Sequence, residues 1–379
     1  MPMTACRILR AVLFLLIAAA FCTPAAMAQA PSTRPFRMGI SPWPYDLTQA
    51  AVDWTSSAIR QHGDIIEQHF EEGVPWPEAL AGSPYPKNFV DTVESRVRAM
   101  AGKKRVVSIS PLDTLRHGLA YYRGSAVNMP LPTPWDHYRL NDPAVKKAYL
   151  NYAEYIVDHM KPDYLVIGVE VNILLRDRPD LWADYLDLHR ATYQALKARY
   201  PSLPIMVSFF CVPFFAGESL PDEAPQQDRA LAALLPYTDI VGFSVYPFIS
   251  SLLADSVPAD YFSRLFAGAR GKPVAITESG YPAREWSITV NHAPVLFNGT
   301  PEKQDSFLSR MLTAARQYRL RFVCWFAVRD YDSLWDKMGR SDGLLIWRDT
   351  GLFDENGAPR PALETWDRWL RRPYVPEGR

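Results

Sequence analysis

The sequence predicts an α/β protein folded as a single (β/α)8 (TIM) barrel. Eight short runs rich in β-branched or aromatic residues alternate with amphipathic stretches, a rhythm typical of parallel βαβ units. The 379-residue chain has no linker that would mark a second domain. It also lacks the G-x-G-x-x-G and G-x-x-x-x-G-K-[ST] motifs of the common nucleotide-binding open sheets. Eight strand and helix repeats in a chain of this length favour a closed barrel.

The predicted strands are apolar runs of strand length, bounded by polar, Gly or Pro residues. They are RMGIS from Arg37, DIIEQHF from Asp64, RVVSIS from Arg105, YLVIGVE from Tyr164, PIMVSFF from Pro204, DIVGFSVY from Asp239, PVAITES from Pro273 and RFVCWFA from Arg321.

The predicted helices lie between these strands, where apolar residues recur at helical spacing. They cover Leu47–Arg60, Phe89–Met100, Ala144–Met160, Leu181–Tyr200, Tyr261–Ala269, Pro301–Tyr318 and Ala362–Leu370. The longest intervals, Pro111–Pro143 and Tyr281–Thr300, are predicted to be loops at the C-terminal face of the barrel, where ligands bind.

The first 28 residues are predicted to be a cleaved signal peptide. Arg7 and Arg10 precede an apolar run over Ala11–Phe21, and the small-residue site Ala26-Met27-Ala28 follows. The barrel domain is then 29–379, secreted or periplasmic, with an uncleaved anchor as the alternative. The mature chain keeps only Cys211 and Cys324, too few for a disulfide framework.

Charge and motif content exclude several classes of function. Lys plus Arg and Asp plus Glu number 41 each, so the sequence shows no basic footprint for nucleic acid or for an anionic membrane. The seven His are scattered without a Cys/His cluster, and no G-x-S-x-G elbow occurs. We therefore expect no metal and no cofactor, and no pattern indicates an oligomeric state.

Two predicted strands end in a carboxylate. Two-residue alternation places Glu170 on the face of Val166 and Gly168, and Glu278 on the face of Ile276. The ends of strands four and seven meet at the barrel mouth, so both carboxyl groups can flank one glycosidic bond. A separation of ~5–5.5 Å permits retention of anomeric configuration, and ~6.5–9.5 Å permits inversion.

The motifs around these carboxylates resemble a known group of enzymes. GVEVN and ITESGYP resemble the strand-four and strand-seven signatures of clan A retaining glycoside hydrolases, the 4/7 superfamily. ITESGYP, with Trp286 after it, is most similar to family 53, the arabinogalactan endo-β-1,4-galactanases. The resemblance implies that Glu278 is the nucleophile and Glu170 the acid/base. It also implies that Tyr246 hydrogen-bonds the nucleophile and that Trp325 forms the floor of a sugar subsite.

One position departs from the clan pattern. Val169 stands where most members carry an Asn that binds the sugar 2-hydroxyl, whereas Asn172 is expected on the face of Glu170, one step further out. Val169, Val171 and the nearby Glu278 charge are expected to raise the pKa of Glu170, as an acid catalyst requires. A catalytically inactive barrel that binds carbohydrate is the alternative that Val169 keeps open.

Further candidate ligand contacts follow the strand ends. Trp43, Trp76 and Trp286 are expected to offer stacking surfaces to sugar rings, and His69 and Glu67 to hydrogen-bond sugar hydroxyls. Each also has an ordinary structural explanation in packing or ion pairing. The sequence thus predicts a secreted retaining glycoside hydrolase that cleaves β-glycosidic bonds in a polysaccharide or oligosaccharide. A metal-dependent polysaccharide deacetylase is the third alternative.

Overall fold

A computed structural model describes residues 33–215, 223–250, 257–290 and 293–376. Residues 34–379 form one compact unit, and the predicted signal peptide lies outside the described residues. In the part of the chain that is described, no helix is long and apolar enough to cross a membrane.

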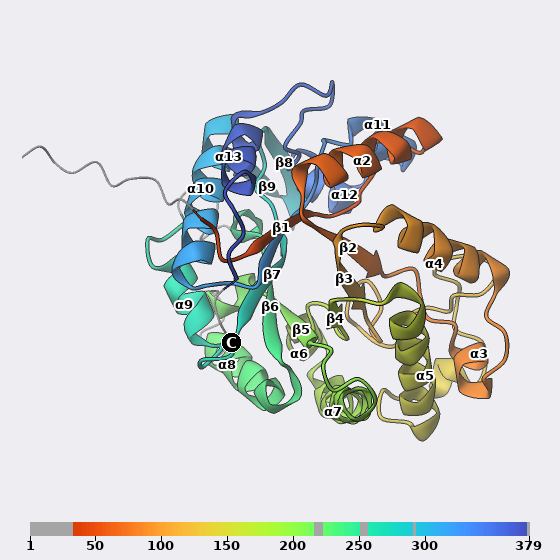
Figure 1. Ribbon diagram of the computed structural model, residues 1–379. Coiled ribbons are helices and arrows are strands. Elements are labelled where there is room, and N and C mark those ends of the chain that lie inside the picture. The colour runs from red at the N-terminus through yellow and green to blue at the C-terminus, as the bar shows by residue number, and fades with distance from the viewer. Residues whose placement is uncertain (1–32, 216–222, 251–256, 291–292, 377–379) are drawn as a thin grey trace, which may run out of the picture. The chain divides into compact units, whose positions relative to one another are not determined.

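Eight parallel strands form the central sheet, in the order β1-β10-β7-β6-β5-β4-β3-β2 (Figure 1). β1 and β2 approach each other at the ends of this order, where the Asp64 N–H donates to the Met38 carbonyl at 2.9 Å. The strands are β1 (Arg37–Ile40), β2 (Ile65–Phe70), β3 (Lys104–Ile109), β4 (Tyr164–Val166), β5 (Ile205–Phe210), β6 (Ile240–Val245), β7 (Val274–Ser279) and β10 (Phe322–Trp325). The predicted (β/α)8 barrel and its eight strands are confirmed.

Helices surround these strands (Figure 1). The longer ones are α2 (Gln49–His62), α4 (Lys87–Ala99), α5 (Pro143–Met160), α7 (Trp182–Arg199), α8 (Glu223–Leu234), α10 (Pro301–Gln317) and α13 (Pro361–Leu370). Short helices are α3 (Trp76–Ala81), α6 (Asn172–Asp177), α9 (Tyr261–Ala267), α11 (Asp332–Lys337) and α12 (Asp342–Arg348), and 3-10 turns occupy Trp135–His137, Pro179–Leu181, Val212–Phe214, Leu235–Tyr237 and Pro247–Ile249.

The predicted helices lie within two residues of the observed ones at each end. Thr300 caps α10 by accepting a hydrogen bond from the Lys303 N–H, and Pro301 occupies the first turn. Thr48 caps α2 in the same way through the Ala51 N–H. α8 was not predicted from the sequence.

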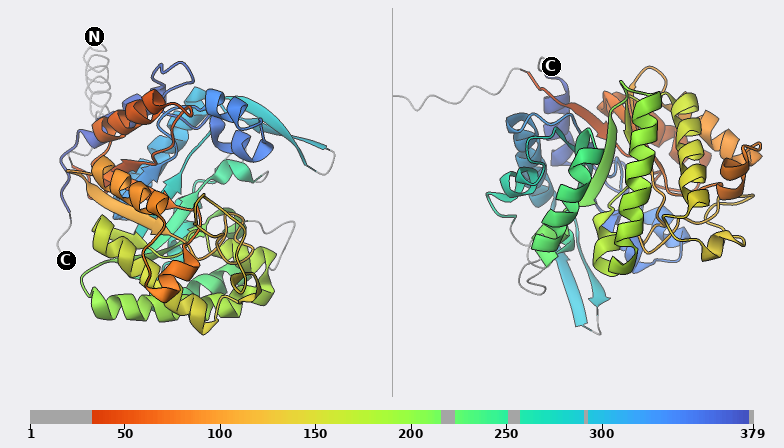
Figure 2. Two further views of the ribbon diagram at one scale, coloured as in Figure 1. Left: turned by 90° about the vertical axis from the view of Figure 1, so that its right-hand side faces the viewer. Right: turned by 90° about the horizontal axis from the view of Figure 1, so that it is seen from below.

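The interval Tyr281–Thr300 is a hairpin rather than the loop that the sequence predicted. β8 (Glu285–Val290) and β9 (Ala293–Asn298) pair antiparallel after β7. Figure 2 shows the hairpin extending away from the barrel strands. Near its base Trp286 stacks on Phe297, with ring centroids 3.9 Å apart.

The apolar core has two layers. One fills the space between strands and helices. The other lies inside the barrel and consists of Ile65, Val106, Val166, Val169, Met206, Ile240, Ala275, Phe322 and Cys324. In β10 Phe322 and Cys324 therefore face the lumen, whereas Val323 and Trp325 face the helices, as two-residue alternation requires.

Candidate active site

A β-bulge in β7 turns Glu278 toward the lumen. Phe243 of β6 pairs with Ile276, but the next residue, Ser244, pairs with Glu278, so Thr277 is the extra residue. Ile276 packs in the outer layer between strands and helices. The expectation that Ile276 and Glu278 share a face is therefore wrong, and it is the bulge that brings the carboxylate into the barrel mouth.

The segment after β4 is also irregular. β4 ends at Val166, and Val169 packs in the lumen layer. A Cβ at Gly168 would collide with the Tyr185 hydroxyl of α7, so Gly168 faces the helices. The predicted shared face of Val166, Gly168 and Glu170 is wrong, because regular alternation stops before Glu170.

Glu170 occupies the left-handed backbone region, with φ of 50°. Such a conformation costs of order 1–3 kcal/mol for a residue with a side chain, and it persists where neighbours impose it. Here the Glu170 N–H donates to the Ser208 hydroxyl at 3.0 Å, and the Val171 N–H donates to the Ser208 carbonyl at 3.1 Å. Ser208 of β5 thus fixes the backbone that carries the Glu170 carboxylate.

Glu278 lies between a hydroxyl donor and an imidazole. The Tyr246 hydroxyl donates to Glu278 Oε2 at 3.1 Å, which is the hydrogen bond that the resemblance implied. Nε2 of His69 lies 3.7 Å from Glu278 Oε1. The Glu278 side chain keeps 17% exposure, so a ligand in the mouth can reach it.

Glu170 lies beside a guanidinium that sequence reasoning missed. Nη2 of Arg116 is 3.4 Å from Glu170 Oε2 and 2.6 Å from Glu71 Oε1. Its Nη1 donates to the Asp113 and Thr114 carbonyls at 3.1 and 3.0 Å, which anchors the buried side chain in the loop after β3. No motif around Arg116 marks this position, because the contact joins three separate segments.

β2 supplies two further titratable side chains to the mouth, Glu67 and His69. Glu67 is fully buried, and Nε2 of His69 lies 2.7 Å from its Oε1. The Ser41 and Ser108 hydroxyls donate to the Glu67 carboxylate at 3.1 and 3.3 Å. His69 therefore lies between Glu67 and Glu278, much as Arg116 lies beside Glu71 and Glu170.

Burial and like charge shift the titration of the two mouth carboxyls. Burial raises the pKa of Glu278; the charge of His69 opposes this shift, and the charge of Glu170 adds to it. Burial also raises the pKa of Glu170, against the opposing charge of Arg116. Two such neighbours titrate as a unit and favour retention of one proton between them. An acid-assisted nucleophilic attack likewise begins with one proton on the pair, carried by the acid.

Asn172 does not reach the mouth. It is fully buried at the start of α6, where its Nδ2 donates to the Phe210 carbonyl at 2.9 Å and its Oδ1 accepts from the Phe210 N–H at 2.7 Å. Both ends of the amide are thus occupied by the end of β5. The expectation that Asn172 binds substrate is wrong.

The expectation that Trp325 forms the floor of a sugar subsite is also wrong. It is fully buried and faces the helix layer, and its indole N–H donates to the Thr350 carbonyl at 2.9 Å. The next residue, Phe326, is partly exposed, and its N–H donates to the Ser279 carbonyl beside Glu278 at 2.7 Å. Sequence reasoning missed Phe326 because the residue that points outward in β10 was assigned to the lumen.

Among the other predicted platforms, only Trp43 is partly exposed at the mouth. Its ring centroid lies 5.7 Å from that of Phe326 and 5.9 Å from that of Tyr331. Trp76 is fully buried and donates its indole N–H to the Ala120 carbonyl, and Trp286 is buried against Phe297. Neither Trp76 nor Trp286 presents a ring face for a sugar.

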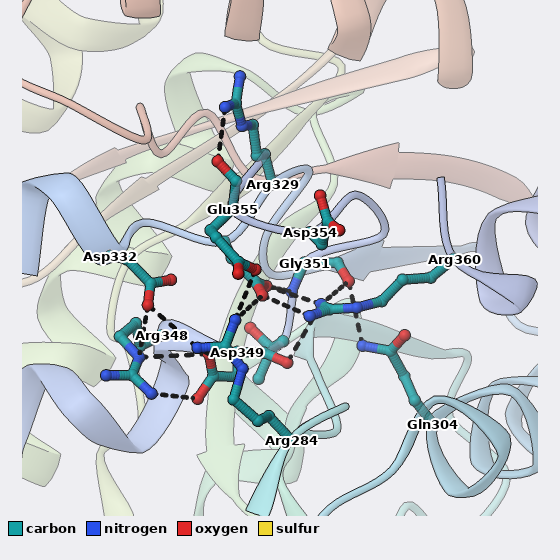
Figure 3. Close-up of polar contacts among 12 residues, drawn as sticks. Arg284, Gln304, Arg329, Asp332, Arg348, Asp349, Gly351, Asp354, Glu355 and Arg360 are labelled. Carbon is teal, nitrogen blue, oxygen red and sulfur yellow. Dashed lines mark hydrogen bonds and ion pairs between the residues drawn. The ribbon is translucent and has the colours of Figure 1, made fainter. Parts of the chain in front are cut away.

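A second charged cluster lies after β10 (Figure 3). Ligand atoms of Asp330, Asp332 and Asp349 lie within 4.8 Å of one another, a spacing compatible with a metal ion. Arginines already pair with all three. Arg360 binds Asp330 at 2.5 and 2.8 Å, Arg348 binds Asp349 at 2.8 Å, and Arg284 binds Asp332 at 3.1 Å. The cluster is an ion-pair network that joins the base of the β8–β9 hairpin to the segments following β10.

Comparison with known proteins supports the fold. No protein-family model and no curated protein sequence matches the chain. An exo-β-1,4-mannosidase, Op5Man5, from an Opitutaceae bacterium has a TM-score of 0.60 at 17% identity, over 89% of this chain and 60% of that chain. The chain thus spans less than two thirds of that neighbour.

Two further neighbours cover more of their own length. A GH5_18 structure from Streptomyces cattleya in complex with Manβ1-4GlcNAc has a TM-score of 0.62 at 17% identity, over 91% of this chain and 83% of that chain. The GH53 catalytic domain of Ignisphaera aggregans has a TM-score of 0.54 at 16% identity, over 92% and 98%. The protein therefore shares the (β/α)8 barrel fold with these GH5_18 and GH53 structures.

Proposed function

We propose that this protein is a retaining glycoside hydrolase that cleaves β-linked sugars by double displacement. The observation that carries the proposal is the meeting of Glu170 and Glu278 at the barrel mouth. Both side chains are largely buried yet partly accessible, and each lies beside a basic side chain. The negative charge of Glu170 also contributes to the raised pKa of Glu278, which supports their placement as neighbours.

In the first step, an oxygen of ionised Glu278 attacks the anomeric carbon while Glu170 donates its proton to the glycosidic oxygen. The bond to the leaving group breaks, and a glycosyl ester of Glu278 forms. Glu170, now ionised, takes a proton from water as that water attacks the anomeric carbon. The ester bond breaks, the sugar departs with its original configuration, and both carboxyls return to their starting states.

Tyr246 and a nearby aromatic surface support the proposed reaction. The Tyr246 hydroxyl favours the ionised form of Glu278 and orients one oxygen, leaving the other for attack. Trp43 and Phe326 provide the partly exposed aromatic surface beside Glu278 on which a sugar ring would stack.

The fold neighbours suggest which sugars to test first. One is titled an exo-β-1,4-mannosidase, one is bound to Manβ1-4GlcNAc, and one is a GH53 domain. We propose a β-linked oligosaccharide or polysaccharide as substrate, with β-mannosides and β-1,4-galactan as the leading candidates. Export through the 1–28 signal peptide remains part of the proposal.

The test is a hydrolysis screen of the mature chain against mannan, galactan, glucan and aryl β-glycosides, with Glu278→Ala and Glu170→Ala in parallel. We expect turnover by the wild type on at least one substrate and its loss in Glu278→Ala. Binding without turnover across the whole panel would instead support an inactive carbohydrate-binding barrel. Full activity in Glu278→Ala would remove Glu278 as the nucleophile.

A further inference from the structure

The two-residue spacing of Glu67 and His69 places both side chains on the lumen side of β2. Ile65, two residues earlier, packs in the lumen layer, so the same alternation turns Glu67 and His69 inward. Glu67 has no exposure, whereas His69 is one fifth exposed at the mouth end. Along the lumen side of β2, Ile65, Glu67 and His69 therefore follow one another from the barrel interior toward the mouth.

The buried Glu67 carboxylate is held by several polar partners. Its carboxylate receives the Ser41 hydroxyl from the end of β1, the Ser108 hydroxyl from β3 and the close ion pair of His69. A buried carboxylate without partners would be strongly destabilising. Three strands therefore contribute groups whose shared contact is this one side chain.

The imidazole bridges this anchor and the proposed nucleophile. Nε2 of His69 lies 2.7 Å from Glu67 Oε1 and 3.7 Å from Glu278 Oε1. The His69 backbone is held as well, since Arg96 of α4 donates to its carbonyl. A ring fixed in this way presents the same nitrogen to both carboxylates.

We propose that His69 is a cationic positioning residue for Glu278, and that Glu67 holds the imidazole in place and keeps it charged. The inference rests on the proposed function, because it assigns His69 to the nucleophile rather than to a sugar hydroxyl. His69 acts on Glu278 and needs no contact with substrate.

The charges around the imidazole favour its cationic form. Burial alone would lower the pKa of His69, but the negative charges of Glu67 and Glu278 raise it to about 10. The titratable and charged groups that face this pair from the surrounding segments are Glu71, Arg116, Glu170, Tyr246 and Cys324. Arg116 is engaged with Glu71 and Glu170, whereas Nε2 of His69 lies 3.7 Å from Glu278 Oε1.

The first experiment follows His69 itself and requires no substrate. Histidine ring signals are titrated by NMR in the wild type and in Glu67→Gln, with the His69 signal assigned by its absence in His69→Gln. We expect His69 to stay charged well above neutral pH in the wild type, and its pKa to fall by about one unit or more in Glu67→Gln. Titration near the ordinary value of 6.5, or no change in Glu67→Gln, would overturn the inference.

The second experiment measures kcat/KM against pH for His69→Gln and His69→Lys. Loss of the cation raises the pKa of Glu278, so the acid limb in His69→Gln should move to higher pH by about one unit. His69→Lys restores a positive charge and should return the limb toward its wild-type position. His189→Gln is the matched control, since His189 is a buried histidine of α7 that bonds the Tyr237 carbonyl outside the mouth.

The outcomes separate the two proposals. If Glu278→Ala keeps full activity, the proposed function fails whatever His69 does. If Glu278→Ala is inactive while the acid limb stays in place in folded His69→Gln, only the role of His69 fails. A limb that moves equally in His69→Gln and His189→Gln would also reject the specific role of His69.

Discussion

Ser244 of β6 pairs with Glu278 of β7, although regular register after the Phe243 and Ile276 pair would give it Thr277. This one-residue shift decides whether residue 278 faces the helices or the lumen. Because Thr277 is the extra residue, its deletion would remove the bulge and still leave Glu278 opposite Ser244, on the lumen face of Ala275. We expect a folded deletion variant to keep activity, and a folded variant without activity would show that register alone does not set the direction of Glu278.

Glu278→Ala should lower kcat by at least roughly 10⁴-fold, because the nucleophile is removed. Added azide should partly restore turnover of an activated aryl glycoside and give the α-glycosyl azide, since azide attacks from the vacated side. Glu94→Ala, at an exposed position of α4, is the control and should keep full activity. A β-glycosyl azide from Glu278→Ala would reverse the assigned roles.

Glu170→Ala should separate substrates by leaving group. Loss of the acid slows substrates with poor leaving groups by about 10²–10⁴-fold, whereas a dinitrophenyl glycoside needs no protonation to depart. On the activated substrate, azide should accelerate breakdown of the intermediate and give the β-glycosyl azide. Equal losses on both substrate classes would contradict an acid role for Glu170.

Tyr246→Phe should lower kcat by roughly 10²-fold without loss of the fold, because Glu278 loses the hydroxyl that orients its Oε2. Tyr261→Phe is the matched control. It removes a buried hydroxyl that donates to Cys211 at 3.0 Å, away from the mouth. Kinetics of both variants, with circular dichroism as the check on folding, would test the prediction, and equal effects would show general destabilisation.

Stability should depend on pH through the buried acids. Burial raises the pKa of Glu170 above its unfolded value, so its contribution is favourable at low pH and is lost as pH rises through the folded pKa. Glu170→Gln removes the ionisable group and should raise the thermal midpoint by roughly 2 °C at neutral or alkaline pH, with less effect at acid pH. A gain restricted to acid pH would have the wrong sign.

The ion-pair network near the hairpin should contribute to stability rather than to catalysis. Arg360 is the partner of the fully buried Asp330, and burial raises the pKa of that carboxyl to about 7 despite Arg360. Arg360→Met would remove the close ion pair of Asp330, which keeps the Gly351 N–H and Arg284 at 4.0 Å, and should cost about 3 kcal/mol of unfolding free energy. Chemical denaturation measures the loss, with Arg98→Ala of an exposed α4 pair as the control expected to change little.

The sequence was sufficient for the barrel because each strand and most helices carry local signals. Apolar runs mark the eight strands, and Thr300 with Pro301 marks the start of α10. The β8–β9 hairpin was missed because Tyr281–Thr300 reads as a loop, although Trp286 and Phe297 stack across the two strands. That contact is visible only once the chain has folded back.

The sequence prediction placed Glu278 at the mouth by assuming regular alternation in β7, and the structure shows that a bulge places it there. Regular alternation would turn Glu278 toward the helices, and the bulge at Thr277 reverses that direction. Trp325 was assigned to a sugar subsite from the resemblance, but alternation from the lumen-facing Phe322 and Cys324 turns it outward, so Phe326 takes the exposed place. Contacts such as that of Arg116 with Glu170 depend on loop geometry, which single-sequence patterns do not encode.

Covalent trapping tests the central claim most directly. The wild type is incubated with activated 2-deoxy-2-fluoro β-glycosides of the gluco, manno and galacto series. The masses of the intact protein and of its proteolytic peptides are then measured by mass spectrometry. The account predicts the addition of one fluoroglycosyl unit, carried by the peptide that contains Glu278 and absent in Glu278→Gln. An enzyme that hydrolyses the parent glycoside yet carries the label on another residue, or turns over with inversion and no label, would contradict it.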